Sequence, residues 1–349
     1  MSLGSKTMAR SNQEQLESAW RALAGMEGDQ GWRVIDVARS KNGVIQAGRC
    51  FPGREESLLI GTRGLRVGSD TNLPRGQGFS VAYIDPVDSA GDWTWFALSR
   101  TSAGQPALFA LMAEDLLALF AQAGGYDGER IRVAMLGRIR AWQDFMKRDR
   151  LGVLSPEAEL GLFGELVVLR DIVCSGVPAA DAVRYWAGPE EGLQDYLIGT
   201  GAVEVKSTVS PAGFIAEIGS LEQLDDSLRQ PLYVAAVRFS LSPDGLTLPE
   251  ICAELEAVFV EEAGSPLILK DKLISAGYVD LMAEKYSRRF LLQHIGYRLI
   301  RPDSPRLTRG NVPAPVQRAR YSLDLEVIPV VASEFGAIFK SFGDVTTWS

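Results

Sequence analysis

The sequence predicts an α/β (α+β) fold with two parts. The first part contains antiparallel strands and helices, and the second is a core with a central mixed sheet flanked by helices. Three observations predict it. Short apolar runs separated by Gly, Pro and Asp turns fill the first hundred residues, as in antiparallel sheets. A capped helix and a glycine hairpin follow from residue 155 onward. Residues 231–239 are a continuous apolar run, which is typical of a strand covered on both faces.

The length of 349 residues favours two domains, and we place them at 1–149 and 150–349. In the first domain we expect five strands, at 32–37, 44–47, 57–60, 79–84 and 93–98. We expect two helices after them, at 106–123 and 127–148. Five of the seven tryptophans lie here, among them Trp32, Trp93, Trp95 and Trp142. Such rings can stack on nucleic-acid bases, but core packing is their default role. Recognition of DNA, docking of a partner and closure over a catalytic site all remain open for this domain.

A helix is expected between Ser155 and Gly176, because a serine N-cap, a proline at the first helical position and a terminal glycine bound an apolar segment. Glu165 lies in the middle of it. Its neighbours three and four residues away are apolar or glycine. A carboxylate on an apolar helical face is unfavourable unless another group compensates it, so Glu165 is a candidate functional residue.

The next candidate feature is the hairpin at residues 194–207. If Gly199-Thr200 forms a two-residue turn, the numbers of paired residues sum to 399, and Asp195 faces Glu204. Lys206 then points to the same face as Glu204, because side chains alternate along a strand. Two carboxylates and an ammonium at one strand end outline a site for a divalent metal ion.

Beyond the hairpin we expect a strand at 213–218, a helix at 220–228 that begins near Gln223, and the strand at 231–239. His294 is the only histidine, in an apolar run that suggests a packed core position. A single histidine excludes His-dependent triads and most zinc hydrolases. Three distant cysteines without CxxC spacing favour reduced thiols in apolar surroundings.

Taken in order, Glu165, Asp195 and Glu204-Val205-Lys206 resemble the core motif of the PD-(D/E)XK nuclease superfamily, whose fold is restriction endonuclease-like. Gln194 replaces the usual proline before the aspartate. Gly164-Glu165-Leu166 and Trp186-Ala187-Gly188-Pro189 look like a branch of the superfamily found near restriction and phage-defence systems. The resemblance covers residues 150–240 most closely.

The resemblance implies an endonuclease in which Asp195, Glu204 and Glu165 hold Mg²⁺ or Mn²⁺ and Lys206 lies near the attacking water. Gln223 and Ser207 are second-rank candidates. Gln223 matches a glutamine that some of these nucleases use near the metal, but a glutamine on a surface helix is also ordinary. Ser207 could contact phosphate or could satisfy hydrogen bonds at the end of a strand.

The net charge of −8 argues against a protein that coats DNA generally. Residues 285–320, however, carry nine basic residues against one acid. Candidate DNA contacts in this segment are Arg288, Arg289, Arg301, Arg306 and Arg309. The alternative is a solvated loop that pairs with the chain's own acidic surface. No apolar run approaches the ~20 residues of a membrane span, and the start lacks a signal sequence, so we expect a cytoplasmic protein.

These observations favour a Mg²⁺-dependent DNA nuclease in restriction or phage defence, acting as a homodimer or with a defence-system partner. Two alternatives stay open. One is an inactive nuclease-fold scaffold or a module that binds nucleic acid or a partner. The other is an acidic interaction protein whose resemblance is accidental; it predicts that the Asp195 and Glu204 strands do not lie side by side.

Overall fold

The computed structural model describes residues 3–25, 30–64, 73–76, 78–85, 92–147, 153–190, 193–260 and 265–343. The chain divides into two compact units, Met1–Leu151 and Gly152–Ser349. The domain boundary that we expected after residue 149 lies outside the described residues, as does the predicted helical end at Arg148. Among the described residues, no helix combines the length and the apolar character that a membrane span requires.

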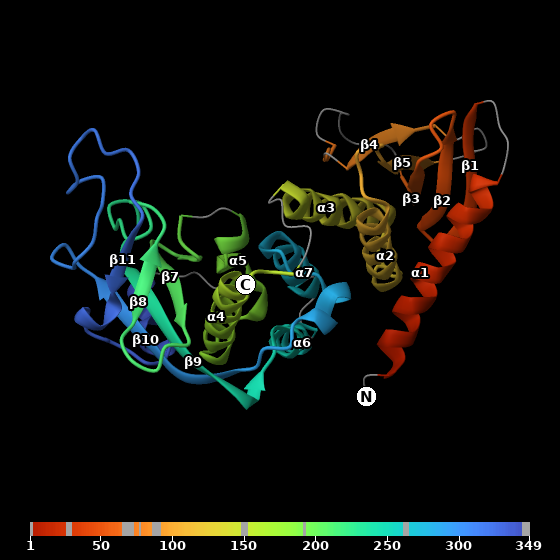
Figure 1. Cartoon of the computed structure of the whole chain (residues 1–349). Coiled ribbons are helices and arrows are strands. Elements are labelled where there is room, and N and C mark those ends of the chain that lie inside the picture. Colours follow the sequence, from red (N-terminus) through yellow and green to blue (C-terminus); the bar gives the residue numbers. More distant parts are fainter. Residues whose placement is uncertain are drawn as a thin grey trace. The chain divides into compact units, whose positions relative to one another are not determined.

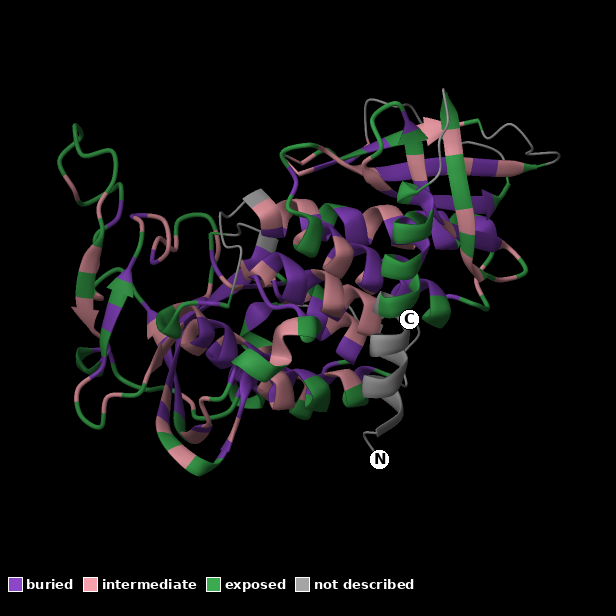
Figure 2. Ribbon diagram, turned by 45° about the vertical axis from the view of Figure 1, so that its right-hand side comes forward, coloured by how far each residue is buried: buried purple, intermediate pink, exposed green. Residues whose placement is uncertain are grey.

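The first unit is built on an antiparallel sheet of five strands in the order β1-β2-β3-β5-β4. The strands are β1 (Gly31–Arg39), β2 (Gly43–Phe51), β3 (Glu56–Arg63), β4 (Phe79–Ile84) and β5 (Trp93–Arg100). Each predicted strand is present and most are longer than expected. Buried and exposed residues alternate at the start of β4. Figure 2 shows that the helices also carry both buried and exposed residues along their length.

Three helices accompany this sheet: α1 (Leu3–Ala24), α2 (Pro106–Gln122) and α3 (Gly128–Lys147). The sequence predicted α2 and α3 but not α1. The buried Trp20 of α1 donates from its indole N–H to the Ser57 carbonyl of β3 at 2.9 Å. Trp142 of α3 is fully buried and donates to Asp115 of α2 at 2.8 Å. Trp20 and Trp142 therefore have structural roles.

The second unit contains a mixed sheet in the order β10-β9-β7-β6, in which only the β7–β9 pair is parallel. Its strands are β6 (Tyr196–Ile198), β7 (Gly201–Thr208), β9 (Leu232–Leu246) and β10 (Phe290–Ile300). A two-stranded sheet of β8 (Ile215–Ile218) and β11 (Tyr321–Asp324) accompanies it (Figure 1).

Two separate cores cover the two faces of the mixed sheet. On one face, Val203 and Val205 join a cluster with apolar side chains of α4 (Pro156–Cys174), α5 (Ala179–Tyr185), α6 (Leu248–Phe259) and α7 (Ser265–Ala276). On the other face, Ala202 and Val234 pack with residues of β8 and of the segment after β11. The result is a helical layer, a mixed sheet and a smaller sheet, consistent with the expected α/β fold.

The hairpin register agrees with the prediction. Tyr196 pairs with Val203, Leu197 with Ala202, and Ile198 with Gly201, so each pair of numbers sums to 399 around the Gly199-Thr200 turn. Gly199 has a φ of 51°, a left-handed conformation that glycine adopts without steric cost. The β6 and β7 strands lie side by side, with Asp195 directly before β6 and Glu204 within β7, contrary to the prediction of an accidental resemblance.

The predicted helix at 220–228 is wrong: this segment is a series of turns. The Ser220 hydroxyl accepts a hydrogen bond from the Glu222 N–H, and the Asp225 carboxylate accepts one from the Ser227 N–H. Such short side-chain bonds to the backbone compete with helix formation. The segment therefore folds as a turn that presents Gln223.

Two core assignments are also wrong. His294 is exposed, because a β-bulge between Leu292 and His294 shifts the β10 register at this point. All three cysteines are free, but only Cys252 is buried, whereas Cys50 and Cys174 are exposed.

Candidate active site

The four predicted residues come from α4 and from the β6–β7 hairpin. Ser155 caps α4 by accepting the Ala158 N–H at 3.2 Å, and Pro156 opens the helix as predicted. Glu165 lies at the middle of α4. Asp195 directly precedes the edge strand β6, and Glu204 and Lys206 lie on β7.

Glu204 and Lys206 form an ion pair in which the Lys206 ammonium lies 2.8 Å from Oε1 of Glu204. Glu204 is 2% exposed, while the Lys206 side chain is 16% exposed. The Asp195 carboxylate is held by the backbone of the neighbouring strand, because its Oδ2 accepts the Val205 N–H at 2.7 Å. Asp195 and Glu165 are half-buried, so the cluster keeps a partly open side.

Glu165 is held from two sides. The Trp186 indole N–H donates to its Oε2 at 2.7 Å, and the Tyr196 hydroxyl donates to its backbone carbonyl at 2.7 Å. A Cβ placed on Gly188 would lie 3.0 Å from this Oε2 and 2.9 Å from Oδ1 of Asp195. The two carboxylate oxygens therefore flank the same small space, which is open only because residue 188 is a glycine.

The pKa of each carboxyl is raised in this cluster. The pKa of Glu165 is raised well above its ordinary value by burial, by the Asp195 charge and, less strongly, by the Glu204 charge. The Trp186 hydrogen bond and the Lys206 charge lower this pKa but do not offset the rise. Burial also raises the pKa of Asp195, and burial with the Asp195 charge raises that of Glu204 to about 8. For Lys206, burial lowers the pKa, but the three carboxylates outweigh it and the pKa lies above its usual range. One ammonium does not compensate three carboxylates.

These residues fit a hard divalent cation by their chemistry. The donors are oxygens, Oε2 of Glu204 is buried without a hydrogen-bond partner, and the space beside Gly188 lies against Asp195 and Glu165. When all four groups are ionised, a divalent ion would balance their excess negative charge. Among the described residues, however, no group of three or more Asp, Glu, His or Cys side chains is already arranged to hold a metal ion. Binding would therefore require the carboxylate side chains to rearrange.

Of the second-rank candidates, Gln223 contacts the cluster and Ser207 does not. Oε1 of Gln223 lies 3.5 Å from the Lys206 ammonium and accepts the Gly219 N–H at 2.7 Å. Ser207 points to the opposite face of β7, where a Cβ on Gly164 of α4 would overlap its Oγ. The strand alternation that aligns Glu204 with Lys206 directs Ser207 away from them.

Gln194 contributes a contact that the sequence did not predict. It is 6% exposed, and its amide donates to the Glu222 carbonyl at 3.1 Å. It therefore fastens the turn that carries Gln223 beside Lys206. In the sequence, only the replacement of the usual proline by Gln194 indicated that this position differs from the superfamily motif.

Four of the five arginines predicted to contact nucleic acid form ion pairs within the chain. The pairs are Arg288–Glu159, Arg289–Glu250, Arg306–Asp226 and Arg309–Glu222. These contacts match the alternative that the sequence left open, a segment that pairs with the chain's own acids. Arg301 has no carboxylate within ion-pair distance among the described residues, and its N–H donates to Ser304.

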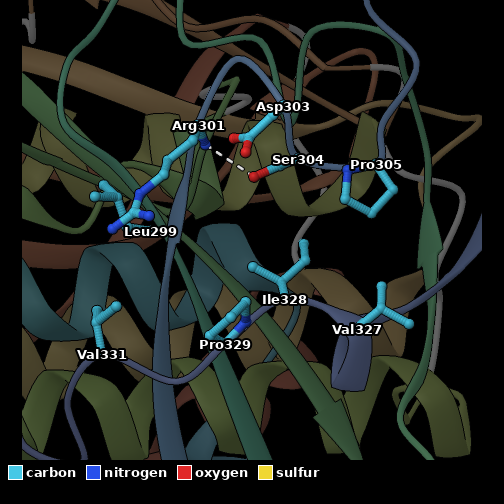
Figure 3. A pocket seen from close by; sticks show the side chains of 9 residues that line it. All are labelled: Leu299, Arg301, Asp303, Ser304, Pro305, Val327, Ile328, Pro329 and Val331. Atoms are coloured by element: carbon cyan, nitrogen blue, oxygen red, sulfur yellow. Dashed lines mark hydrogen bonds between the residues drawn. The ribbon is translucent and has the colours of Figure 1, made fainter.

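A pocket of about 200 Å³ lies at the end of β10, where Arg301 and Asp303 line it together with apolar residues (Figure 3). None of Glu165, Asp195, Glu204 or Lys206 lines this pocket. It is therefore separate from the carboxylate cluster.

Comparison with known families gives one match over residues 16–326, to the DUF4420 family, described as "Putative PD-(D/E)XK family member". No curated protein and no solved structure gives a significant match to the chain.

Proposed function

Because the family match spans most of the chain, the protein belongs to this PD-(D/E)XK family and has a nuclease-like fold, and from this premise we propose that it is a metal-dependent nuclease that hydrolyses phosphodiester bonds in DNA. The observation that carries the proposal is the convergence of Glu165, Asp195, Glu204 and Lys206 at one end of the β6–β7 hairpin. No histidine takes part in this arrangement.

Each residue has a distinct role in the proposed reaction. Asp195 and Glu204, with Glu165, would hold Mg²⁺ or Mn²⁺ through carboxylate oxygens. The bound ion would act as a Lewis acid on the phosphate and would favour deprotonation of a water molecule. Lys206 would orient the attacking water and offset the negative charge that develops on the phosphate oxygens. Gln223 would keep the Lys206 ammonium in place through its Oε1.

A second candidate is a nuclease-fold scaffold without catalytic activity. Two observations favour it: Lys206 already neutralises Glu204, and no three-residue metal group is preformed among the described residues. Such a protein would keep the cluster as a structural ion pair and would bind nucleic acid or a partner.

DNA as the substrate, a role in restriction or phage defence, and a second copy or a defence-system protein as partner are parts of the same proposal. The family membership supports a nuclease, and these finer assignments rest on the sequence arguments above. Exposed basic groups available for phosphate contacts are fewer than the sequence suggests, since only Arg301 of the five candidates is without an acidic partner among the described residues.

The experiment that tests the function is calorimetric titration of Mn²⁺ into the wild type and into Glu204→Gln, with plasmid cleavage measured in parallel. Glu254→Gln is the matched control, because Glu254 lies in the same unit, pairs with Arg170 and is 47% exposed. We expect Mn²⁺ binding and cleavage in the wild type and in the control, and loss of both in Glu204→Gln.

The outcomes separate the two candidates. Mn²⁺ binding without cleavage of plasmid or of single-stranded DNA contradicts the nuclease and favours the scaffold. Absence of Mn²⁺ binding in the wild type contradicts the metal site altogether.

A further inference from the structure

The segment from Trp186 to Gly188 contacts both Glu165 and Asp195. The backbone N–H groups of Ala187 and Gly188 donate to the Asp195 carbonyl at 2.7 and 3.0 Å. Trp186 forms an isolated antiparallel bridge with Tyr196, the residue that follows Asp195. The segment is therefore fastened to the beginning of β6, and its side chains are fixed relative to the cluster.

The Trp186 side chain controls the direction of one carboxylate. It is fully buried, and its indole N–H can only donate, so the Glu165 carboxylate accepts this hydrogen bond, through Oε2. The neighbouring Asp195 and Glu204 carboxylates repel Glu165. Without the indole N–H, the Lys206 charge would be the only attraction described for this carboxylate in the cluster, and no hydrogen bond would fix its direction.

Lys272 holds Trp186 in turn. It lies on α7, is 6% exposed, and donates from its ammonium to the Trp186 backbone carbonyl. A buried ammonium is unfavourable unless it is bonded, and the Trp186 carbonyl is an acceptor for it. The chain of contacts therefore runs from Lys272 through Trp186 to Glu165, and it joins α7 to α4.

We propose that Trp186 is a positioning residue of the metal site: its indole N–H keeps Oε2 of Glu165 turned toward Oδ1 of Asp195, and Lys272 fixes Trp186. The inference rests on the proposed function, because it assigns Trp186 a role in holding the metal ion. Neighbours of metal ligands that orient them typically change metal affinity by about 10- to 100-fold when they are removed.

The competing explanation is that Trp186 only fills the core, and Trp142 provides a matched control for it. Both indoles are fully buried, and both donate to a carboxylate, at 2.7 Å for Trp186 and 2.8 Å for Trp142. Trp142 belongs to the first unit, whereas the carboxylate cluster belongs to the second. Trp→Phe at either position removes the N–H and leaves most of the apolar ring.

The test uses the full-length chain and Mn²⁺ titration by calorimetry on five proteins: wild type, Trp186→Phe, Trp142→Phe, Glu165→Gln and the double variant Trp186→Phe/Glu165→Gln. We expect Trp186→Phe to weaken Mn²⁺ binding about tenfold or more. Trp142→Phe should change the Mn²⁺ affinity less than about twofold, even if it lowers thermal stability as much as Trp186→Phe does. In the Glu165→Gln background, Trp186→Phe should have little further effect, because Trp186 acts through this carboxylate.

Equal Mn²⁺ affinity in wild type and Trp186→Phe, or additive losses in the double variant, overturns the positioning role while the metal site stands. If the wild type itself binds no Mn²⁺, the proposed function fails and the positioning role fails with it. Should Trp186→Phe not fold, Lys272→Met carries the test, because it frees the Trp186 carbonyl and retains the indole. Loss of Mn²⁺ affinity of about threefold or more in a folded Lys272→Met supports the role, and unchanged affinity overturns it.

Discussion

In the proposed reaction, Lys206 is the residue whose substitution most directly separates metal binding from catalysis. It compensates Glu204 in the ion pair and repels any cation that approaches the same carboxylates. Lys206→Met should lower the cleavage rate about 100-fold or more, because the developing phosphate charge loses its ammonium partner. The same substitution should strengthen Mn²⁺ binding by a few-fold, since one positive charge leaves the site.

Calorimetry and plasmid cleavage measure both effects on one preparation. Lys270→Met is the control, because Lys270 pairs with Glu256 and Asp280 in the same unit and is 22% exposed. A Lys206→Met protein that cleaves at the wild-type rate would remove Lys206 from the proposed chemistry.

Substitution of Gly188 tests whether the proposed metal ion lies in the space beside the Glu165 and Asp195 carboxylates. Gly188→Ala would place a methyl group 3.0 Å from Oε2 of Glu165 and 2.9 Å from Oδ1 of Asp195. We expect Mn²⁺ affinity to fall about tenfold or more, because the methyl group occupies the space beside both oxygens. Gly161→Ala on α4 is the control, since its added Cβ meets no atom within 4 Å. Equal affinities of the two variants would place the ion elsewhere.

Among the helices, α2 carries a carboxyl whose ionisation opposes folding. Glu114 is 3% exposed, and its Oε2 is buried without a hydrogen-bond partner. Burial, with the charges of Glu17 and Asp115, raises the pKa of Glu114 to about 7. Because the folded-state pKa exceeds the ordinary value of 4.5, the stability of the wild type should fall as the pH rises from about 4.5 to 7 and should stay constant above.

Glu114→Gln removes this dependence. The variant should match the wild type near pH 4.5 and exceed its unfolding free energy at pH 8. The excess should be at most about 3.5 kcal/mol, because the pKa rises from 4.5 to about 7 and one pKa unit corresponds to about 1.4 kcal/mol. Urea unfolding at both pH values measures the difference. Glu17→Gln should give a smaller gain, since it removes only one of the two neighbouring charges. Equal stability of Glu114→Gln and wild type at pH 8 would show that Glu114 finds a partner in solution.

The elements also show which kinds of structure could be predicted from the sequence. The α4 helix and the β6–β7 hairpin were predictable because Ser155, Pro156 and the Gly199-Thr200 turn act within a few residues of themselves. The helix expected at 220–228 failed for a local reason too: side-chain bonds to the backbone outweighed helical propensity.

The supporting contacts of the site could not be predicted, because they join distant parts of the chain. Lys272 and Trp186 are 86 residues apart, and Arg309 and Glu222 are 87 apart. Strand alternation predicts that Glu204 and Lys206 share a face, but no periodicity indicates which acid a given arginine meets. The sequence therefore predicted which carboxylates and which lysine form the candidate site. The residues that contact them are evident only from the fold.

For the whole molecule, the net charge of −8 and the internal pairing of the arginines predict weak, mildly salt-dependent binding to DNA. Each phosphate neutralised by a basic side chain steepens the slope of log Kobs against log salt by about 0.9 on duplex DNA. With four of the five candidate arginines paired to acids, we expect a slope no steeper than about −3, measured by fluorescence anisotropy in Ca²⁺, which should suppress cleavage.

Arg309 is the paired arginine with the most exposed side chain, at 56%, so it is the one that can most easily exchange Glu222 for a phosphate. Arg309→Ala should reduce the slope by at most about 1, and Glu222→Gln should steepen it by a similar amount, because it releases the guanidinium. Arg170→Ala is the control, since Arg170 of α4 pairs with Glu254 of α6 and is not one of the five candidate arginines. A wild-type slope near −4.5, about 0.9 for each of the five arginines, would mean that the paired arginines leave their acids when DNA binds. The ion pairs would then describe only the free protein.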